Sequence, residues 1–332
     1  MACQRGEGED GRPQVIKFDG FDLPTDGPMS SRKHGLIHFE HARYWHPEDE
    51  AFVKVYAQLG LHRYNLLEGT NIQFLHLKSY NRGMNCGAAP YYLSLFADCP
   101  DSGRTLPFHA LVSENRIGCL DISVPIARPR CSEEQPRLCR PTYTCSPLPR
   151  WPSSEMFAQR RFYTLNEHEL RNTDWVRLYL DLAHSTCDRG MTDSQLSDFY
   201  IEQVAIRSLS DADPPRLDSK SVVVYMVYKD LAKDRLGEPC YRKAIIRRVY
   251  EESSRSLTFQ GKHWSFSEEK EKKKKKRQEE ICTAQETFRC LRSLAFGDRC
   301  LQETWHPLFF DHSLISDLSE YYYYVILCFL CS

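Results

Sequence analysis

Residues 50–80 read EAFVKVYAQLGLHRYNLLEGTNIQFLHLKSY, and this stretch predicts how the fold begins. Its apolar side chains recur at intervals of three and four residues, at Phe52, Val55, Tyr56, Leu59, Leu61 and Tyr64. That spacing predicts an amphipathic helix that starts near Glu48 and ends before Gly69. The apolar run at 72–80 is typical of a strand, so the stretch predicts a helix followed directly by a strand.

Three further strand-like runs follow at residues 91–97, 106–112 and 117–126, separated by polar loops that contain Gly and Pro. A helix followed by hairpin-linked strands indicates an α+β fold, with the helix packed on an antiparallel sheet. A proline-rich connection at 128–165 then interrupts the pattern, because proline removes a backbone donor and blocks helix interiors.

The same order of elements repeats beyond the connection. Apolar positions from Trp175 to Ala183 predict a second helix, and strand-like runs follow at 199–206, 222–228, 241–249 and 257–264. We therefore infer a tandem duplication. The predicted organisation is a disordered segment (1–30), a first module (31–127), the connector (128–165), a second module (166–266), a charged helix (267–297) and a C-terminal tail (298–332).

Composition excludes several classes of protein. The 332 residues carry a net charge of −1, so no global field favours nucleic acid or an anionic membrane. The N-terminal residues are polar, which predicts no secretory leader, and the 14 cysteines are then expected to be reduced thiols.

The apolar run at 321–331 is shorter than the roughly 20 residues that a spanning helix needs. No spacing predicts a metal site, a cofactor or a catalytic motif.

Several phrases resemble known families. Residues 59–65, LGLHRYN, are similar to the plant cystatin signature, and the likeness extends to about residue 112. GLHRYNLLEGTNIQF (60–74), PLPRWPSSEMF (147–157), TDWVRLYL (173–180) and YMVYKD (225–230) resemble a crucifer-restricted, uncharacterised, cystatin-related family that includes embryo-defective and male-sterility proteins. This resemblance covers roughly residues 14–264. It implies two cystatin-like modules and a non-catalytic role in plant reproductive development, in male meiosis or embryogenesis.

Cystatins insert a Gln-x-Val-x-Gly hairpin into papain-type proteases, so the resemblance locates a degenerate inhibitor loop at Gly83, Asn85 and Gly87. Only the final glycine of that motif is present here. A degenerate cysteine-protease inhibitor is therefore an alternative function, and an enzyme with an unrecognised site is another.

The charged segment carries the strongest short motif. Its consecutive basic residues are Lys272, Lys273, Lys274, Lys275, Lys276 and Arg277. Such a run is typical of a nuclear-import signal, although neighbouring glutamates also fit a solvated linker helix. The expected location is the nucleus, with the cytoplasm as the alternative.

Apolar residues with coiled-coil spacing follow the basic run, at Ile281, Ala284, Phe288, Leu291 and Ala295. They predict a surface for a protein partner or a second copy of the chain, with nucleic acid and membrane not expected as partners. The alternative is an amphipathic helix that docks on its own domain.

Overall fold

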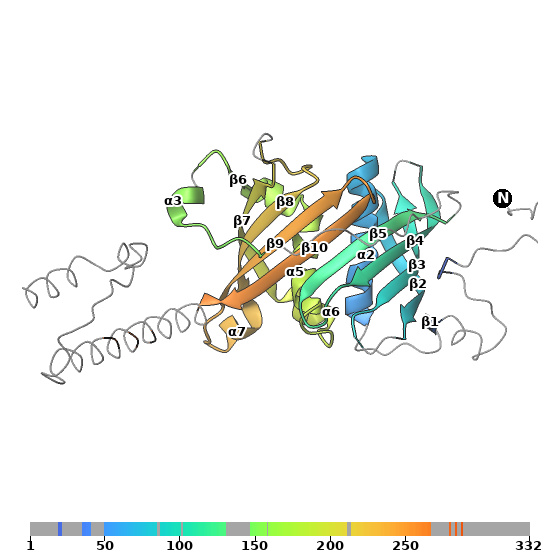
Figure 1. Cartoon of the computed structure of the whole chain (residues 1–332), viewed down its shortest axis with the longest axis horizontal. Coiled ribbons are helices and arrows are strands. Elements are labelled where there is room, and N and C mark those ends of the chain that lie inside the picture. The colour runs from blue at the N-terminus through green and yellow to red at the C-terminus, as the bar shows by residue number, and fades with distance from the viewer. Residues whose placement is uncertain are drawn as a thin grey trace, which may run out of the picture. The chain divides into compact units, whose positions relative to one another are not determined.

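The computed structural model describes residues 19–21, 35–40, 50–84, 87–100, 102–130, 147–157, 159–210 and 214–266, and the single positions 279, 283 and 287. The chain divides into two compact units, Met1–Glu271 and Lys272–Ser332. All the strands described belong to the first unit (Figure 1).

The first half of this unit contains a short strand, a long helix and a four-stranded meander. Its elements are β1 (Leu36–Glu40), α2 (Glu50–Glu68), β2 (Gln73–Gly83), β3 (Pro90–Cys99), β4 (Arg104–Glu114) and β5 (Leu120–Pro129). Helix α2 ends at Gly69, whose φ of 67° favours glycine. The Asn65 side chain then binds both backbone groups of Ile72, which sets the path of the chain into β2.

The second half repeats this order with short additional elements. It consists of α3 (Ser154–Phe157), β6 (Tyr163–Thr164), α4 (Glu167–Arg171), α5 (Asp174–Ser185), α6 (Asp193–Ser197), β7 (Phe199–Ser208), β8 (Val222–Asp230), α7 (Leu231–Arg235), β9 (Tyr241–Glu251) and β10 (Ser256–Ser265). Capping boxes formed by Asn166 with Glu169 and by Thr192 with Gln195 start α4 and α6.

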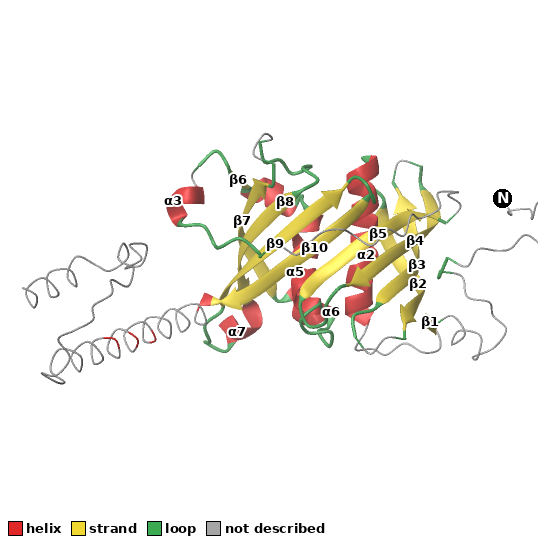
Figure 2. Ribbon diagram, in the orientation of Figure 1, coloured by secondary structure: helices red, strands yellow, loops and turns green. Residues whose placement is uncertain are grey.

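The strands of both halves form one sheet. Its order is β1-β2-β3-β4-β5-β10-β9-β8-β7-β6, and every neighbouring pair is antiparallel. The last strands of the two halves, β5 and β10, pair at the centre, where Phe259 lies opposite Ile122. Helices α2 and α5 cover the same face of this sheet (Figure 2).

The main core lies between the two helices and the sheet. Alternate strand residues point to this face, and aromatic side chains such as Phe52, Tyr56 and Tyr91 contact one another there. Gly60, at the middle of α2, faces Ala110 of β4. A Cβ atom at position 60 would lie 2.3 Å from the Ala110 Cβ, so glycine allows the helix to approach the sheet closely.

Two smaller clusters cover the opposite face. In the first half Phe21 stacks on His109, with ring centroids 4.4 Å apart. In the second half Trp151 and Phe162 pack on Tyr225. Each cluster is built by a chain segment that precedes the half it covers.

The structure confirms the predicted α+β class, the two long helices and the eight predicted strands. Strands β1 and β6 and the short helices are additional to the prediction. Although residues 1–30 are predicted to be disordered, residues 19–21 lie against the sheet, where Asp19 forms an ion pair with Arg128. The cystatin likeness of the two modules and the C-terminal coiled coil stay predictions.

Candidate functional site

The residues predicted for nuclear import and for partner binding, Lys272–Arg277 and the apolar set from Ile281 to Ala295, lie outside the described residues. Glu279, Thr283 and Thr287 are described, and all three are helical and exposed. The hydroxyls of Thr283 and Thr287 each donate to the carbonyl oxygen four residues earlier, at 2.8 Å. The described positions in the second unit thus have the helical geometry that the sequence predicts there.

The predicted inhibitor loop lies between β2 and β3. Gly83 ends β2, where a Cβ atom would lie 2.8 Å from Pro90 Cδ, whereas Gly87 has open space around it. Asn85 is not among the described residues. The structure therefore places both described glycines at one hairpin, and glycine is sterically required only at Gly83.

A buried carboxylate links this hairpin to the second half. Glu114 accepts hydrogen bonds from the Tyr56 hydroxyl at 3.0 Å and from the Ala89 backbone N–H at 3.2 Å. Arg189, which follows α5, completes the group with an ion pair of 2.7 Å to Glu114. Burial raises the pKa of Tyr56, and the Glu114 charge raises it further, so the phenol stays a neutral donor.

The neighbouring hairpin also contacts the second half. Burial raises the pKa of the Cys187 thiol, which has a hydrogen bond with the Leu120 backbone at the start of β5. Both hairpins at this end of the first half therefore lie against residues 187–189. In the cystatin interpretation, this is the end that would enter a protease cleft.

A second buried cluster joins both helices to β9. The Arg248 side chain is fully buried, and its Nη1 lies 3.1 Å from His62 Nε2 and donates to the Tyr179 hydroxyl. Its remaining donors bind the backbone carbonyls of Ser219 and Lys220. Burial, and then the charge of Arg248, hold the pKa of His62 well below its usual range.

His184, near the end of α5, forms a third buried group. Its Nε2 lies 2.8 Å from the Tyr228 hydroxyl, and its ring stacks on Phe199 and His263 with centroids 3.9 and 4.1 Å away. Burial lowers the pKa of His184 to about 2, assisted by His263 and Arg242. Although His184 is the kind of residue used in acid–base catalysis, here it is a neutral packing residue at physiological pH.

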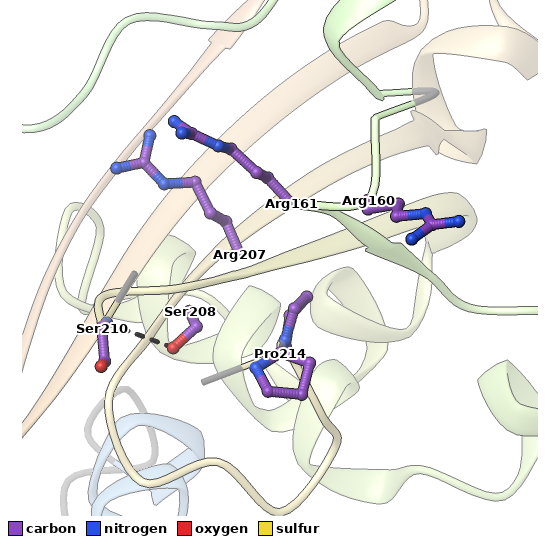
Figure 3. A pocket seen from close by; sticks show the side chains of 7 residues that line it. Arg160, Arg161, Arg207, Ser208, Ser210 and Pro214 are labelled. Carbon is purple, nitrogen blue, oxygen red and sulfur yellow. Dashed lines mark hydrogen bonds between the residues drawn. The ribbon is translucent and has the colours of Figure 1, made fainter. Parts of the chain in front are cut away.

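The described residues form an open basic pocket at the end of β7, here called the arginine pocket. It measures about 410 Å³, including the solvent at its mouth, and is lined by Arg160, Arg161, Arg207, Ser208, Ser210, Pro214 and Pro215. Figure 3 shows Arg161 and Arg207 extending to the same side of the pocket, while Arg160 points away from them. The Ser208 hydroxyl accepts a hydrogen bond from the Ser210 N–H at 3.2 Å.

Strand pairing and a tight turn create this arrangement. Tyr163 pairs with Ile206, which brings the segment before β6 alongside the end of β7. The Phe162 N–H donates to the Gln159 carbonyl at 3.0 Å, closing the turn that carries the two adjacent arginines. Phe162 itself is buried against Tyr225 and anchors the turn.

The lining of the arginine pocket determines its chemistry. Among the described residues that line it, the side chains supply guanidinium and hydroxyl groups, with no carboxylate, imidazole or thiol. Such a lining binds anions but offers no group to act as a general base near neutral pH. The described residues also hold no group of three or more metal-ligating side chains, and none of their helices is long and apolar enough to cross a membrane.

Sequence reasoning did not identify the arginine pocket. The Arg160-Arg161 pair is visible in the sequence, but Arg207 is distant along the chain and lies in an ordinary strand pattern. The only available signal was two adjacent arginines without neighbouring acidic residues, and this signal is too common to indicate a site.

Comparison with known proteins places the pocket in a matched region. The sequence model of the family described as Protein MS5 matches residues 148–259, which include every residue that lines the arginine pocket.

Two relatives from Arabidopsis thaliana match much of the chain. UPF0725 protein EMB2204 is 44% identical over 262 residues, covering 76% of this chain and 79% of its own. UPF0725 protein At1g02770 is 36% identical over 264 residues, covering 77% and 82% respectively. The crystal structure of MS5 from Brassica napus is similar with a TM-score of 0.55 and 29% identity, over 65% of this chain and 98% of that one.

Proposed function

The chain belongs to the family of MS5 and the UPF0725 proteins, and from this membership we propose that it acts in plant reproductive development as a non-catalytic binding protein. The names EMB2204 and MS5 stand for embryo-defective and male-sterility proteins, which supports a reproductive role. Male meiosis, pollen fertility and embryogenesis are the stages at which we expect it to act.

One observation carries the binding role. The arginine pocket presents cations and hydroxyls, whereas the buried titratable residues Glu114, His184 and Arg248 are engaged in contacts between elements. Catalysis by a proton-transferring or nucleophilic residue needs such a group at an open cavity. Binding of an anionic partner needs only cationic donors, which the arginines of the pocket supply.

We further propose that the protein acts in the nucleus and uses its C-terminal helix to bind a protein partner or a second copy. The basic run at 272–277 supports nuclear import, and the apolar residues from Ile281 to Ala295 support helix pairing. The helical geometry at Thr283 and Thr287 is consistent with this proposal.

The test compares fluorescent fusions of the intact chain and of a variant with residues 272–276 changed to Gln, both imaged in plant cells. We expect the intact fusion in the nucleus and the variant in the cytoplasm. A control variant replaces two exposed lysines of the sheet, Lys78→Gln and Lys262→Gln, and should enter the nucleus normally. If both the intact fusion and the lysine-run variant stay cytoplasmic, the nuclear proposal is wrong.

The inhibitor alternative has less support. The hairpins that would enter a protease cleft lie against Arg189 and Cys187 of the second half. We therefore expect no inhibition of papain by the intact chain in a fluorogenic peptide assay, with a plant cystatin as the positive control. Inhibition at stoichiometric concentrations would favour the inhibitor function instead.

A further inference from the structure

We propose that the arginine pocket binds a phosphorylated serine or threonine side chain of a protein partner. This inference rests on the proposed binding function and specifies the chemistry of the partner. It uses only the first compact unit (Met1–Glu271), which contains the sheet and is called the sheet unit below, and it does not depend on the C-terminal helix.

The two converging arginines are held by the fold. Arg161 lies within the turn closed by Gln159 and Phe162, and Arg207 lies one residue beyond the last pairing of β6 with β7. Burial raises the pKa of Tyr225, and the positive charge of Arg207 opposes that rise, so Arg207 lies near the tyrosine on which Phe162 packs. Because the backbone that carries both arginines is already held, a ligand has to order only their side chains.

Among the described residues, no carboxylate pairs with Arg161 or Arg207. Three exposed arginines elsewhere in the described part of this unit form ion pairs, namely Arg171–Glu167, Arg235–Asp198 and Arg255–Glu68. The guanidinium groups of Arg161 and Arg207 have no ion pair or hydrogen bond within the described part of the chain. Two neighbouring guanidinium groups repel each other, and a bound anion relieves that repulsion.

Phosphate fits this geometry better than a carboxylate does. A phosphoryl group carries close to two negative charges at neutral pH, and its three oxygens accept forked hydrogen bonds from two guanidinium groups at once. A carboxylate has half the charge and too few oxygens to satisfy both arginines fully.

The lining also favours a peptide over a nucleic acid. Single-stranded nucleic acids are bound by aromatic residues that stack on the bases, and the described lining contains no aromatic side chain. Duplex binding needs a basic stripe that follows many phosphates, whereas this is a single pocket bounded by Pro214 and Pro215. One phosphorylated side chain is the ligand of matching size and charge.

The test measures binding of the intact chain to a fluorescein-labelled peptide pool with central phosphoserine and random flanking residues, by fluorescence anisotropy. The same pool with unmodified serine is the reference. We expect binding of the phosphorylated pool only, and a loss of about tenfold or more in Arg161→Gln and in Arg207→Gln. Arg207→Lys keeps the charge but loses the fork, so its affinity should lie between those of the intact chain and Arg207→Gln.

Arg171→Gln is the matched control, because Arg171 is exposed and outside the pocket. It should bind like the intact chain, and thermal unfolding of each variant shows whether the sheet unit remains folded. Equal binding of both pools, no binding of either, or unchanged affinity in folded Arg161→Gln and Arg207→Gln would overturn the proposal. So would stronger competition by a single-stranded DNA oligomer than by the phosphorylated pool. A cytoplasmic location of the fluorescent fusion would contradict the nuclear proposal but would not affect phosphopeptide binding. The two proposals can therefore be tested independently.

Discussion

Gly60 shows how one residue determines the distance between a helix and a sheet. In isolation glycine weakens a helix by about 1 kcal/mol relative to alanine, yet it lies in the middle of α2. Its neighbour Ala110 leaves no room for a Cβ atom. The small residue of the LGLHRYN motif is therefore explained by packing.

Gly60→Ala should lower the free energy of unfolding by about 1 to 2 kcal/mol, because overpacking at Ala110 outweighs the gain in helix propensity. Urea denaturation followed by circular dichroism measures the change. The double variant Gly60→Ala with Ala110→Gly restores the space and should recover most of the loss. Stability equal to that of the unmodified chain in Gly60→Ala would show that α2 can move away from the sheet at little cost.

His184 makes stability depend on pH. Its pKa of about 2 in the folded chain is far below the ordinary value of 6.5, so the unfolded chain takes up a proton that the folded chain excludes. The contribution of neutral His184 to the free energy of unfolding is fully present above pH 6.5. It is lost as the pH falls toward 2, by about 1.4 kcal/mol per pH unit. The pKa of His62 is also lowered by burial, so His62 likewise makes the free energy of unfolding fall as the pH decreases.

We therefore expect the free energy of unfolding to fall between pH 7 and pH 5, by about 2 kcal/mol from His184. His184→Gln keeps a side-chain oxygen as an acceptor for the Tyr228 hydroxyl but does not titrate. Urea unfolding at several pH values should show a shallower slope for this variant. An identical slope in both proteins would mean that His184 takes up its proton at the same pH in the folded and the unfolded chain.

At the scale of elements, helix and strand formation follow local patterns closely. Helix α2 ends before Gly69 as predicted, α5 ends two residues beyond the predicted Ala183, and the ends of the eight predicted strands differ from the structure by at most three residues. The short helices α4 and α6 were missed because capping by Asn166 and Thr192, not apolar periodicity, defines them.

The C-terminal helix offers a prediction at this scale. Phe288→Asp should abolish self-association or partner binding while leaving the sheet unit folded, because a charge disrupts an apolar helix seam. Thr283→Asp is the control, since Thr283 is exposed and helical spacing puts it outside the stripe of apolar positions. Sedimentation velocity measures association. A lower unfolding temperature of the sheet unit in Phe288→Asp would instead show that the helix docks internally.

At the scale of the whole sheet unit, the two halves share one structure. Strands β5 and β10 pair at the centre, and Arg189 and Arg248 of the second half bind Glu114 and His62 of the first. Removing either half would expose the edge of β5 or β10. Without the second half, Glu114 loses its ion pair with Arg189, and without the first half, Arg248 loses its contact with His62. Both changes favour aggregation or unfolding.

We therefore expect residues 1–146 and 147–271, expressed separately, to be insoluble or unfolded, and co-expression to restore a soluble complex. Residues 1–271 together should unfold in one cooperative transition. Circular dichroism and two-dimensional NMR spectra of the soluble fractions check this. A dispersed NMR spectrum from either half alone would establish the two halves as independent domains.

The sequence by itself determined the α+β class, the two helices, the repeated order of elements and the family resemblance. These follow from periodicity and short motifs, which are local properties of the chain. Only the tertiary structure decided that β5 pairs with β10, that Arg248 and Glu114 join the halves, and that Arg161 and Arg207 line one pocket. Such contacts join residues far apart in sequence, and strand order in a sheet depends on which edges can bury apolar surface together, which no local pattern encodes.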